Sequence, residues 1–279
     1  MQDTIKKTWF ITGASKGLGL ALVKQLLAAG QNVAATSRNT DDLTKAVGTT
    51  HKNFLPLQVD LADDASVKQA IAETNSTFGS VDVLINNAGY GIGGSFEELT
   101  DTEVRNAFDV NVFGTINTIR HALPYMRQQQ SGHIINIASI AGFAAGTGWA
   151  PYAATKFAIV GLTEVLADDV KAFGIKATVI APGAFRTSFL TDDSLAMPQD
   201  PIAAYADIRA SHERYLTMNG NQAGDPEKAA AVMIATGFNP NAPVHLFLGT
   251  DAYSRAMAKI ESLTAEIESL KNITTSTDY

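Results

Sequence analysis

Short apolar runs alternate with longer amphipathic stretches along the whole chain, and this spacing predicts alternating strands and helices. Seven runs rich in β-branched residues have the length and composition of strands. They are Thr8 to Thr12, Asn32 to Thr36, Phe54 to Val59, Val81 to Asn86, His133 to Ile137, Ile175 to Ile180 and Val244 to Leu248. Their apolar residues are continuous rather than alternating, which indicates strands buried on both faces of a parallel sheet.

Five stretches between the strands carry apolar residues at helical spacing, near residues 18–29, 63–78, 101–129, 151–173 and 225–237. Two of these stretches have explicit start signals. Thr100 with Glu103 has the pattern of a capping box, and Asp225 before Pro226 has the pattern of an N-cap followed by a first-position proline. The alternation therefore predicts the α/β class, with a seven-stranded parallel sheet flanked by helices.

Two segments depart from this alternation. Between Ala184 and Ala223 a long polar and aromatic insertion follows the sixth strand, and we expect a mobile cover over a substrate. A last helix, near 251–271, has apolar residues at three- and four-residue steps: Tyr253, Met257, Ile260, Leu263, Ile267 and Leu270. We expect this helix to dock onto the body of the protein. Packing against a partner helix is the alternative, although the repeat is too short to predict a coiled coil.

Composition narrows the class of protein. The 279 residues are 46% hydrophobic and 18% charged, which is enough for a substantial core in one domain. The formal net charge is -7 and no basic cluster appears, which argues against nucleic-acid and membrane-surface partners. Cysteine is absent, the histidines lack metal spacing, and neither a secretory segment nor a membrane-spanning run is evident. We expect a cytoplasmic protein without a bound metal.

A glycine-rich turn follows the first predicted strand. It reads Thr12-Gly13-Ala14-Ser15-Lys16-Gly17-Leu18-Gly19, and a predicted helix begins within it. Glycines at this place let the backbone approach a pyrophosphate, and the N-terminus of the following helix attracts negative charge. The spacing is a variant of the commoner dinucleotide fingerprint, and its position between strand and helix favours nucleotide binding over an ordinary turn.

The end of the second predicted strand indicates which dinucleotide is bound. An acidic side chain at this place would accept hydrogen bonds from the ribose 2′-hydroxyl and select NAD. The chain has Ser37 and Arg38 instead, and no carboxylate appears before Asp41. Arg38 can pair with a 2′-phosphate, and Lys16 could reach the same group, so we predict NADP (NADPH) rather than NAD. The alternative is that Arg38 stacks on the adenine or faces solvent.

Tyr152 and Lys156 lie one helical turn apart, and Ser139 precedes them at the end of a strand-like run. An ammonium about 4 Å from the phenol would contribute roughly 4 kcal/mol at an effective dielectric of ~20, or about three pKa units. Pro151 suits the first residue of a helix, whose positive end would also favour the phenolate. Tyr152 would then exchange protons near neutral pH. Taken alone, the same spacing is typical of a solvated helix face.

Together with Asn86-Asn87-Ala88-Gly89 and Asn111, these motifs resemble those of the short-chain dehydrogenase/reductase family, in its single-domain branch. The resemblance covers residues 7–250 or so, with the motifs in their usual order. It implies a Rossmann-type doubly wound sandwich and one dinucleotide-binding and catalytic domain over 1–279, with a substrate-covering insertion near 184–223 and an extra helix near 251–271. Ala138 before the serine and Pro151 directly before Tyr152 are mild departures that reshape the pocket.

The resemblance also implies residue roles. Tyr152 is the expected general acid/base, Lys156 lowers its pKa and binds the nicotinamide ribose, and Ser139 holds the substrate oxygen. Asn111 is expected to position a water that links Lys156 to solvent. The expected cofactor-binding residues are Gly13, Ser15, Lys16, Gly17, Leu18, Gly19, Ser37, Arg38, Asp60, Leu61, Asn87, Ala88, Gly89, Tyr152, Lys156, Pro182, Gly183, Phe185 and Thr187.

Within that set, Asp60 is expected at the adenine, Asn87 to Gly89 along the adenosine, and Pro182 to Thr187 at the nicotinamide end. Each of these residues also has a purely structural reading. Asn87 could be a turn residue, Asn111 a helix-bending polar residue, Asp60 a helix cap and Ser139 a loop hydroxyl.

The sequence therefore predicts an NADP(H)-dependent oxidoreductase that interconverts a carbonyl and an alcohol by hydride transfer. The alternatives are a catalytically silent dinucleotide-binding sensor or scaffold, and an NAD-preferring dehydrogenase. Residues expected to line a largely apolar substrate pocket are Phe143, Trp149, Phe185, Phe189, Leu190, Leu195, Met197 and Tyr205. Many members of the family form homodimers or homotetramers through the helices near 101–129 and 151–173, and the sequence leaves open whether the extra C-terminal helix permits such an assembly here.

Overall fold

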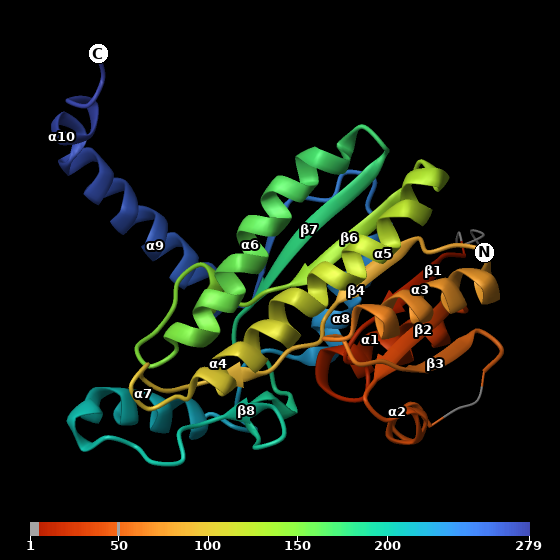
Figure 1. Cartoon of the computed structure of the whole chain (residues 1–279), viewed down its shortest axis with the longest axis horizontal. Coiled ribbons are helices and arrows are strands. Elements are labelled where there is room, and N and C mark those ends of the chain that lie inside the picture. Colours follow the sequence, from red (N-terminus) through yellow and green to blue (C-terminus); the bar gives the residue numbers. More distant parts are fainter. Residues whose placement is uncertain (1–5, 49–50) are drawn as a thin grey trace.

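The computed structural model describes residues 6–48 and 51–279, in which seven parallel strands form one twisted sheet (Figure 1). The strands are β1 (Thr8–Ile11), β2 (Asn32–Ser37), β3 (Phe54–Gln58), β4 (Val83–Asn86), β6 (Gly132–Ile137), β7 (Ile175–Pro182) and β9 (His245–Leu248). Their order across the sheet is β3-β2-β1-β4-β6-β7-β9, and all neighbouring pairs are parallel. The predicted α/β class and seven-stranded parallel sheet are confirmed.

Both faces of the sheet are covered because successive side chains of a strand point to opposite sides. In β1, Trp9 and Ile11 belong to the core on one face and Phe10 to the core on the other. The first face packs against α1 (Gly17–Ala28), α2 (Thr40–Val47) and α8 (Pro226–Phe238), and the second against α3 (Asp64–Phe78), α5 (Gly114–Gln129) and α6 (Ala150–Lys171). Burying each large apolar side chain stabilises the fold by about 1.5–3 kcal/mol. The result is the expected Rossmann-type sandwich.

The predicted helix over 101–129 is interrupted by one π-helical turn. α4 (Asp101–Phe108) begins at the predicted capping box, in which Thr100 and Glu103 each accept a hydrogen bond from the other's backbone. A π-helical segment, Asp109–Phe113, then precedes α5. Such turns insert one residue into a helix and are frequent at functional sites. Here the inserted turn contains Asn111, which is buried.

The order of the strands places the loops that carry the sequence motifs at one edge of the sheet. The chain reverses its direction of travel across the sheet between β1 and β4, which are neighbours. In open parallel sheets a ligand binds at the carboxyl ends of the strands beside such a reversal. The glycine-rich turn follows β1, and Asn87 to Gly89 follow β4, so both motifs lie at this point.

The insertion after β7 contains regular structure, and its expected mobility as a substrate cover stays a prediction. It includes α7 (Ala206–Leu216) and the strand β8 (Leu195–Ala196), which pairs with β5 (Gly91–Ile92). Arg209 of α7 forms an ion pair with Glu98, whose side chain is completely buried. Glu98 also accepts hydrogen bonds from the backbone amides of Ser95 and Ile202. These contacts fasten the insertion to the segment after β4.

The C-terminal helix departs from the prediction more strongly. α9 (Thr250–Ser269), followed by α10 (Lys271–Thr275), projects away from the body of the protein (Figure 1). Only Ala252 and Ala256, in its first two turns, are buried, against a small core that includes Ile140. The expectation that the whole helix docks onto the body is therefore wrong. Within the described residues, no helix has both the length and the apolar character needed to cross a membrane.

Candidate active site

The predicted tyrosine and lysine are both buried in the first turns of α6. Tyr152 is 7% exposed and Lys156 is 4% exposed. The Lys156 ammonium donates a hydrogen bond to the Ile137 carbonyl at the end of β6 (3.0 Å) and lies 5.8 Å from the centre of the Tyr152 ring. Ser139 stands two residues beyond β6, where its hydroxyl accepts a hydrogen bond from the Ala141 amide (3.1 Å). The solvated-face alternative for Tyr152 and Lys156 is thus excluded by their burial.

Burial shifts the pKa values of both groups toward their neutral forms. It raises the pKa of Tyr152 to about 12, and a hydrogen bond with the Ser139 side chain opposes this rise. Burial also lowers the pKa of Lys156 to about 8. The expectation that Lys156 brings the pKa of Tyr152 close to neutrality is wrong in this structure. The cost of removing both groups from water outweighs the attraction between the phenolate and the ammonium, which was the only effect considered from the sequence.

Asn111 links the π-helical turn to the segment after β4 and to α6. Its side-chain amide pairs with both backbone groups of Tyr90 (3.0 Å each) and donates to the Thr155 hydroxyl (3.2 Å). A Cβ atom on Gly89 would lie 3.0 Å from the Asn111 oxygen and 3.4 Å from the Lys156 ammonium. Gly89, Asn111 and Lys156 therefore lie in close approach, and the water that Asn111 is expected to position stays a prediction. The inserted π-helical turn makes this possible because it brings Asn111 inward.

The glycine-rich turn packs closely against the loop after β4. A Cβ atom on Gly13 would lie 2.7 Å from the Ala88 backbone, and one on Gly19 would lie 2.4 Å from the Gly13 carbonyl oxygen. Asn87 donates to the carbonyls of Thr12 and Gly13 (3.0 Å each), and the Thr12 hydroxyl accepts from the amides of Asn87 and Ala88 (3.0 Å each). Asn87 therefore fastens the two loops together, which a single-loop turn residue would not do.

This turn has the features that a dinucleotide pyrophosphate requires. Gly17 begins α1 with a φ of 56°, a conformation that strains other residues. The preceding residue, Lys16, makes no side-chain cap, so the first amides of α1 remain available for an anion. Thr187 lies beside Gly17, because a Cβ atom on Gly17 would be 3.5 Å from that of Thr187. The residues present fit the phosphates of a dinucleotide at this helix end.

The residues predicted to select the dinucleotide lie at the exposed end of β2. The Ser37 hydroxyl accepts from the Asn39 amide, and Asn39 caps α2. Arg38 is exposed and has no side-chain partner among residues 6–48 and 51–279. Lys16 donates instead to the Asp193 carbonyl in the insertion (3.2 Å). In this structure Lys16 therefore points to the insertion and does not lie beside Arg38, where the sequence suggested that it would contact the same phosphate.

Asp60 and Leu61 follow β3 on the same side of the sheet. Asp60 is exposed, and its carboxylate accepts a hydrogen bond from the Ala62 amide (3.0 Å). The Leu61 carbonyl accepts from Asn117 of α5 (3.0 Å). Asp60 is thus a turn-stabilising residue, while α3 is capped by Asp63. The exposed carboxylate remains accessible to a ligand.

The segment after β7 connects the site to the C-terminal helix. The Gly183 amide donates to the Leu248 carbonyl, and a Cβ atom on Gly183 would collide with the Asp251 carboxylate. Asp251 accepts from the Ala184 amide (2.9 Å), which fixes the chain directly after Pro182. Phe185 packs against the core of the first sheet face rather than at Tyr152. The role of Asp251 was not evident from the sequence because only the folded chain brings it to this loop.

Five of the eight predicted pocket residues gather around Tyr152. Trp149, Phe189, Leu190, Leu195 and Met197 share one apolar cluster with it. The centre of the Phe189 ring lies 5.7 Å from that of Tyr152. Three predictions are wrong. Phe143 packs near the root of α9, Phe185 packs on the sheet, and Tyr205 hydrogen-bonds to Glu97. Apolar character alone did not indicate which neighbour would bury them.

The contacts that hold the insertion beside Tyr152 were also missed. His212 of α7 is buried and hydrogen-bonds to the Gly148 carbonyl (2.9 Å), one residue before Trp149. Its ring packs edge-on against Trp149, with ring centres 5.0 Å apart. The histidine spacings indicated only that no metal motif is present, and no other motif marked His212. The sequence also gave no sign of the contacts made by Thr12 and Thr155. Their hydrogen-bond partners, Asn87 with Ala88 and Asn111, are distant in the sequence.

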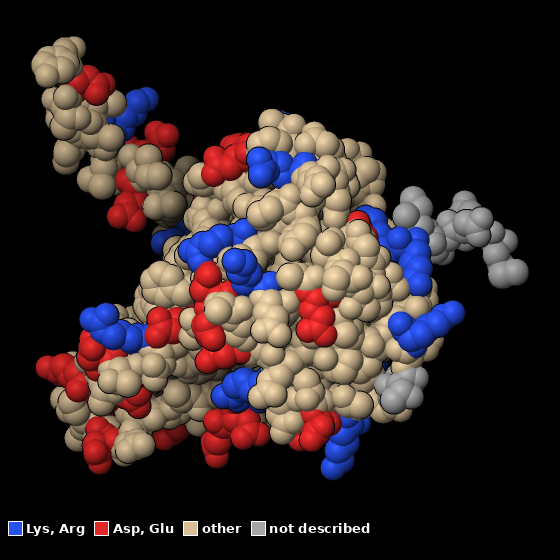
Figure 2. Space-filling model, turned by 45° about the vertical axis from the view of Figure 1, so that its right-hand side comes forward, with Lys and Arg blue, Asp and Glu red and all other residues tan. Residues whose placement is uncertain are grey.

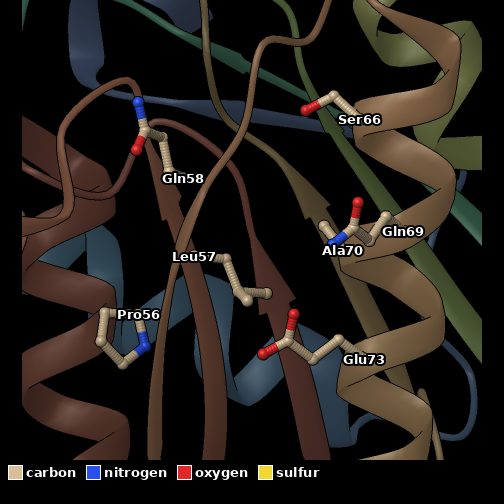
Figure 3. A pocket seen from close by; sticks show the side chains of 7 residues that line it. All are labelled: Pro56, Leu57, Gln58, Ser66, Gln69, Ala70 and Glu73. Atoms are coloured by element: carbon tan, nitrogen blue, oxygen red, sulfur yellow. The ribbon is translucent and has the colours of Figure 1, made fainter.

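A separate hollow of about 270 Å³ lies between β3 and α3 (Figure 3). Its lining is mainly polar and includes Gln58, Ser66, Gln69 and Glu73. It lies at the edge strand of the sheet, whereas Tyr152 lies on α6 beside β7. Among the described residues, no group of three or more metal-ligating side chains is close enough to hold a metal ion.

Comparisons with known proteins agree with this geometry. Residues 7–197 match the family described as short chain dehydrogenase. Oxidoreductase BOA17 of Botryotinia fuckeliana is 34% identical over 268 residues, which cover 96% of this chain and 97% of that protein. The structure of a short-chain dehydrogenase from Streptomyces avermitilis is similar with a TM-score of 0.91 and 34% identity, over 99% of this chain and 100% of that one.

A third protein shows the same fold at lower identity. The structure of a short-chain dehydrogenase/reductase from Burkholderia phymatum in complex with NAD has a TM-score of 0.82 and 21% identity, covering 95% of this chain and 97% of that one. The length of the family match and the identity to BOA17 settle the class. The chain belongs to the short-chain dehydrogenase family of oxidoreductases.

Proposed function

We propose that the chain is an NADP(H)-dependent oxidoreductase that interconverts an aldehyde or ketone and an alcohol by hydride transfer. The observation that carries this proposal is the burial of Tyr152 and Lys156 together, close to Ser139 and at the edge of the sheet where the glycine-rich turn lies. A bound nicotinamide dinucleotide supplies or accepts the hydride. The side chains of this site handle the accompanying proton.

Tyr152 acts as the general acid in reduction. Because its pKa is raised to about 12, the phenol carries its proton throughout the neutral range. It gives this proton to the carbonyl oxygen as negative charge develops there, and the Ser139 hydroxyl donates a hydrogen bond to the same oxygen. The Lys156 ammonium then stabilises the phenolate that remains. Oxidation of an alcohol uses the same groups in reverse.

Other residues would hold the dinucleotide beside this centre. Because Gly13, Gly19 and Gly89 have no side chains, the glycine-rich turn, the loop after β4 and Asn111 pack closely together and would form the wall against which the dinucleotide lies. The free amides at the start of α1 suit the pyrophosphate. The exposed Arg38 guanidinium suits a 2′-phosphate, which favours NADP over NAD. One fold neighbour carries NAD, so the fold itself does not dictate this preference.

The substrate would be a fairly apolar carbonyl or alcohol. Trp149, Phe189 and Met197 pack around Tyr152 and provide apolar surface. The insertion over 184–223 would cover the substrate, since its helix α7 is fastened beside Trp149.

Replacement of Tyr152 by phenylalanine tests the mechanism. Turnover of a panel of aldehydes and ketones should fall by at least about 100-fold, the order of a general acid's contribution. Binding of the dinucleotide, measured by calorimetry, should change little. Tyr125→Phe is the matched control, because Tyr125 of α5 packs against the core beneath α3 and α5 and is not part of the cluster around Tyr152. Full turnover in Tyr152→Phe would contradict the mechanism, and tight binding without turnover of any substrate by the wild type would support a silent sensor.

Replacement of Arg38 by alanine tests the preference for NADP. The wild type should use NADPH more efficiently than NADH, and Arg38→Ala should reduce this ratio by about 10-fold or more, corresponding to loss of a charge-assisted contact. Lys45→Ala, on the exposed face of the adjacent α2, controls for a general loss of positive charge. The ratio of kcat/KM for the two cofactors is the measurement. A wild-type preference for NADH would contradict the assignment.

A further inference from the structure

The projecting helix α9 carries an apolar face that its own chain leaves uncovered. Tyr253, Met257, Ile260, Leu263, Ile267 and Leu270 are each between 42% and 63% exposed. In Figure 2 the arm at the upper left shows uncharged side chains with acidic and basic residues beside them. Large apolar side chains gathered on one exposed face mark a binding surface rather than scattered surface residues.

These residues repeat with the period of two helices packed along their lengths. Tyr253, Ile260 and Ile267 stand seven residues apart, and Ala256, Leu263 and Leu270 form a second series three residues later. This is the pattern of the two core positions of a heptad, and it extends over about three heptads. We call the exposed members of the two series, Tyr253, Ile260, Leu263, Ile267 and Leu270, the α9 seam; Ala256 belongs to the buried root of the helix. Its regular period favours another helix as the occupant.

The root of α9 is fixed to the body, so the seam cannot turn back onto its own chain. Ala252 and Ala256 are buried near Ile140, and the Arg255 guanidinium donates to the Ala144 carbonyl. Asp251 accepts from the Ala184 amide. Beyond this root the helix is exposed on all sides to its end at Ser269. The thirteen residues from Met257 to Ser269 give an exposed arm about 20 Å long.

The charges beside the seam identify a second copy as the occupant. Lys259 and Glu266 each precede a seam isoleucine by one residue, so both lie on the same flank of the helix. When two such helices pack antiparallel, the same flanks face each other, and Lys259 of each copy comes opposite Glu266 of the other. Antiparallel packing also opposes the two helix dipoles favourably. It places the two bodies at opposite ends of the paired arms.

We propose that α9 is a dimerisation arm whose seam packs antiparallel against the α9 seam of a second copy of this chain. In the register set by the charges, Ile260 lies opposite Leu263 of the second copy and Tyr253 lies opposite Leu270. This surface is separate from the helices α5 and α6 through which relatives are expected to associate. The arm therefore adds an association step of its own.

Site-directed cross-linking tests the arrangement, since the chain contains no cysteine. In the proposed register the two copies of residue 263 lie within about 5 Å of each other along the helix axis, whereas the two copies of residue 270 lie about 25 Å apart. With a short bis-maleimide, Leu263→Cys should give a covalent dimer and Leu270→Cys should not. Ser262→Cys, exposed on the opposite side of α9, is the matched control. Equal linkage at 263 and 270, or no linkage at 263, would overturn the proposal.

Sedimentation measurements test the energetics of the same contact. The double variant Ile260→Ser with Ile267→Ser should lose one association step, with a dimer dissociation constant raised by at least about 100-fold. Lys259→Glu should weaken the same step by about 5-fold, and adding Glu266→Lys should restore it. None of these residues touches the Tyr152 site, so turnover by the dissociated variants should persist. Identical masses for the wild type and the double isoleucine variant at every concentration would show that the arm has no such role.

Discussion

At the scale of single residues, Tyr152 and Lys156 are held in forms that favour one direction of proton transfer. Burial keeps the phenol protonated, with a pKa of about 12, and brings the pKa of the ammonium down to about 8. Near neutral pH the pair is therefore a neutral acid beside a positive charge. That state suits donation of a proton to a carbonyl oxygen, followed by stabilisation of the phenolate.

The lowered pKa of Lys156 predicts the pH dependence of reduction. Lys156 is charged below about pH 8 and neutral above it, so the rate of carbonyl reduction should fall as the pH rises through about 8. The measurement is kcat for reduction between about pH 6 and 10, at saturating cofactor. Lys156→Gln should be slower at every pH and should lack this decline. A wild-type rate that stays level through pH 8 would contradict the assigned role.

At Gly19, the addition of a single methyl group should weaken binding of the dinucleotide. A Cβ atom there would lie 2.4 Å from the Gly13 carbonyl and 2.6 Å from the Asn87 amide nitrogen. Gly19→Ala should therefore displace the glycine-rich turn and weaken dinucleotide binding by at least about 10-fold, as measured by calorimetry. Gly161→Ala is the matched control, because Gly161 lies in α6 with no atom within 4 Å of its Cβ position. That control should bind normally and gain up to about 1 kcal/mol of stability.

At the scale of elements, Glu98 connects the insertion to the rest of the protein. Burial acts to raise its pKa, but the amides of Ser95 and Ile202, the Ser95 hydroxyl and Arg209 together lower it to about 2. Since the folded-state pKa lies below the ordinary value of 4.5, the stabilising contribution is present above that value and is lost as the pH falls toward 2. The insertion should therefore loosen in acid before the sheet unfolds.

Glu98→Gln should reproduce this loosening at neutral pH. The glutamine keeps one acceptor oxygen, loses the ion pair with Arg209 and turns an NH2 group toward the backbone amide of either Ser95 or Ile202. The segment containing α7 should therefore be cut by a protease sooner, and KM for the carbonyl should rise by several-fold. Arg105→Gln is the control, because its ion pair with Asp101 lies on the exposed surface of α4. Limited proteolysis and steady-state kinetics measure the two effects. Equal cleavage of Glu98→Gln and the wild type would show that this contact does not fasten the insertion.

At the scale of the whole molecule, periodicity was sufficient to predict the sheet, its parallel strands and the helices on both faces. Those features depend on local patterns that repeat along the chain. The position of α9 depends on which neighbour buries each apolar residue, and an amphipathic stripe fits a body or a partner equally well. Family resemblance pointed to Asn111 and Lys156 as site residues. Their fixing by Tyr90, Thr155 and a π-helical turn required the folded chain.

The hydrogen bonds among the polar residues buried between the strands were likewise not predicted from the sequence, because they join residues far apart along the chain. Asn136 of β6 is completely buried, accepts a hydrogen bond from Asn86 of β4 (2.8 Å) and donates to Thr163 of α6 (2.9 Å). Thr118 of α5 donates to Asn86 and completes the chain of contacts. This network joins two strands and two helices behind the active site. Its loss should therefore affect the whole molecule rather than one segment.

Thr163→Val tests that inference. The valine keeps the shape of the side chain but leaves the buried Asn136 amide without its acceptor, which should lower the free energy of unfolding by about 1–3 kcal/mol. Thr236→Val is the matched control, because each hydroxyl bonds to the carbonyl four residues earlier in its own helix, but only that of Thr163 also accepts from Asn136. Urea unfolding followed by circular dichroism should show one transition at a lower midpoint for Thr163→Val, with activity lost in that same transition. Equal urea midpoints for Thr163→Val and Thr236→Val would show that the Asn136 network does not stabilise the whole molecule. Loss of activity at a urea concentration well below the unfolding of the helices would show that the substitution affects α6 alone.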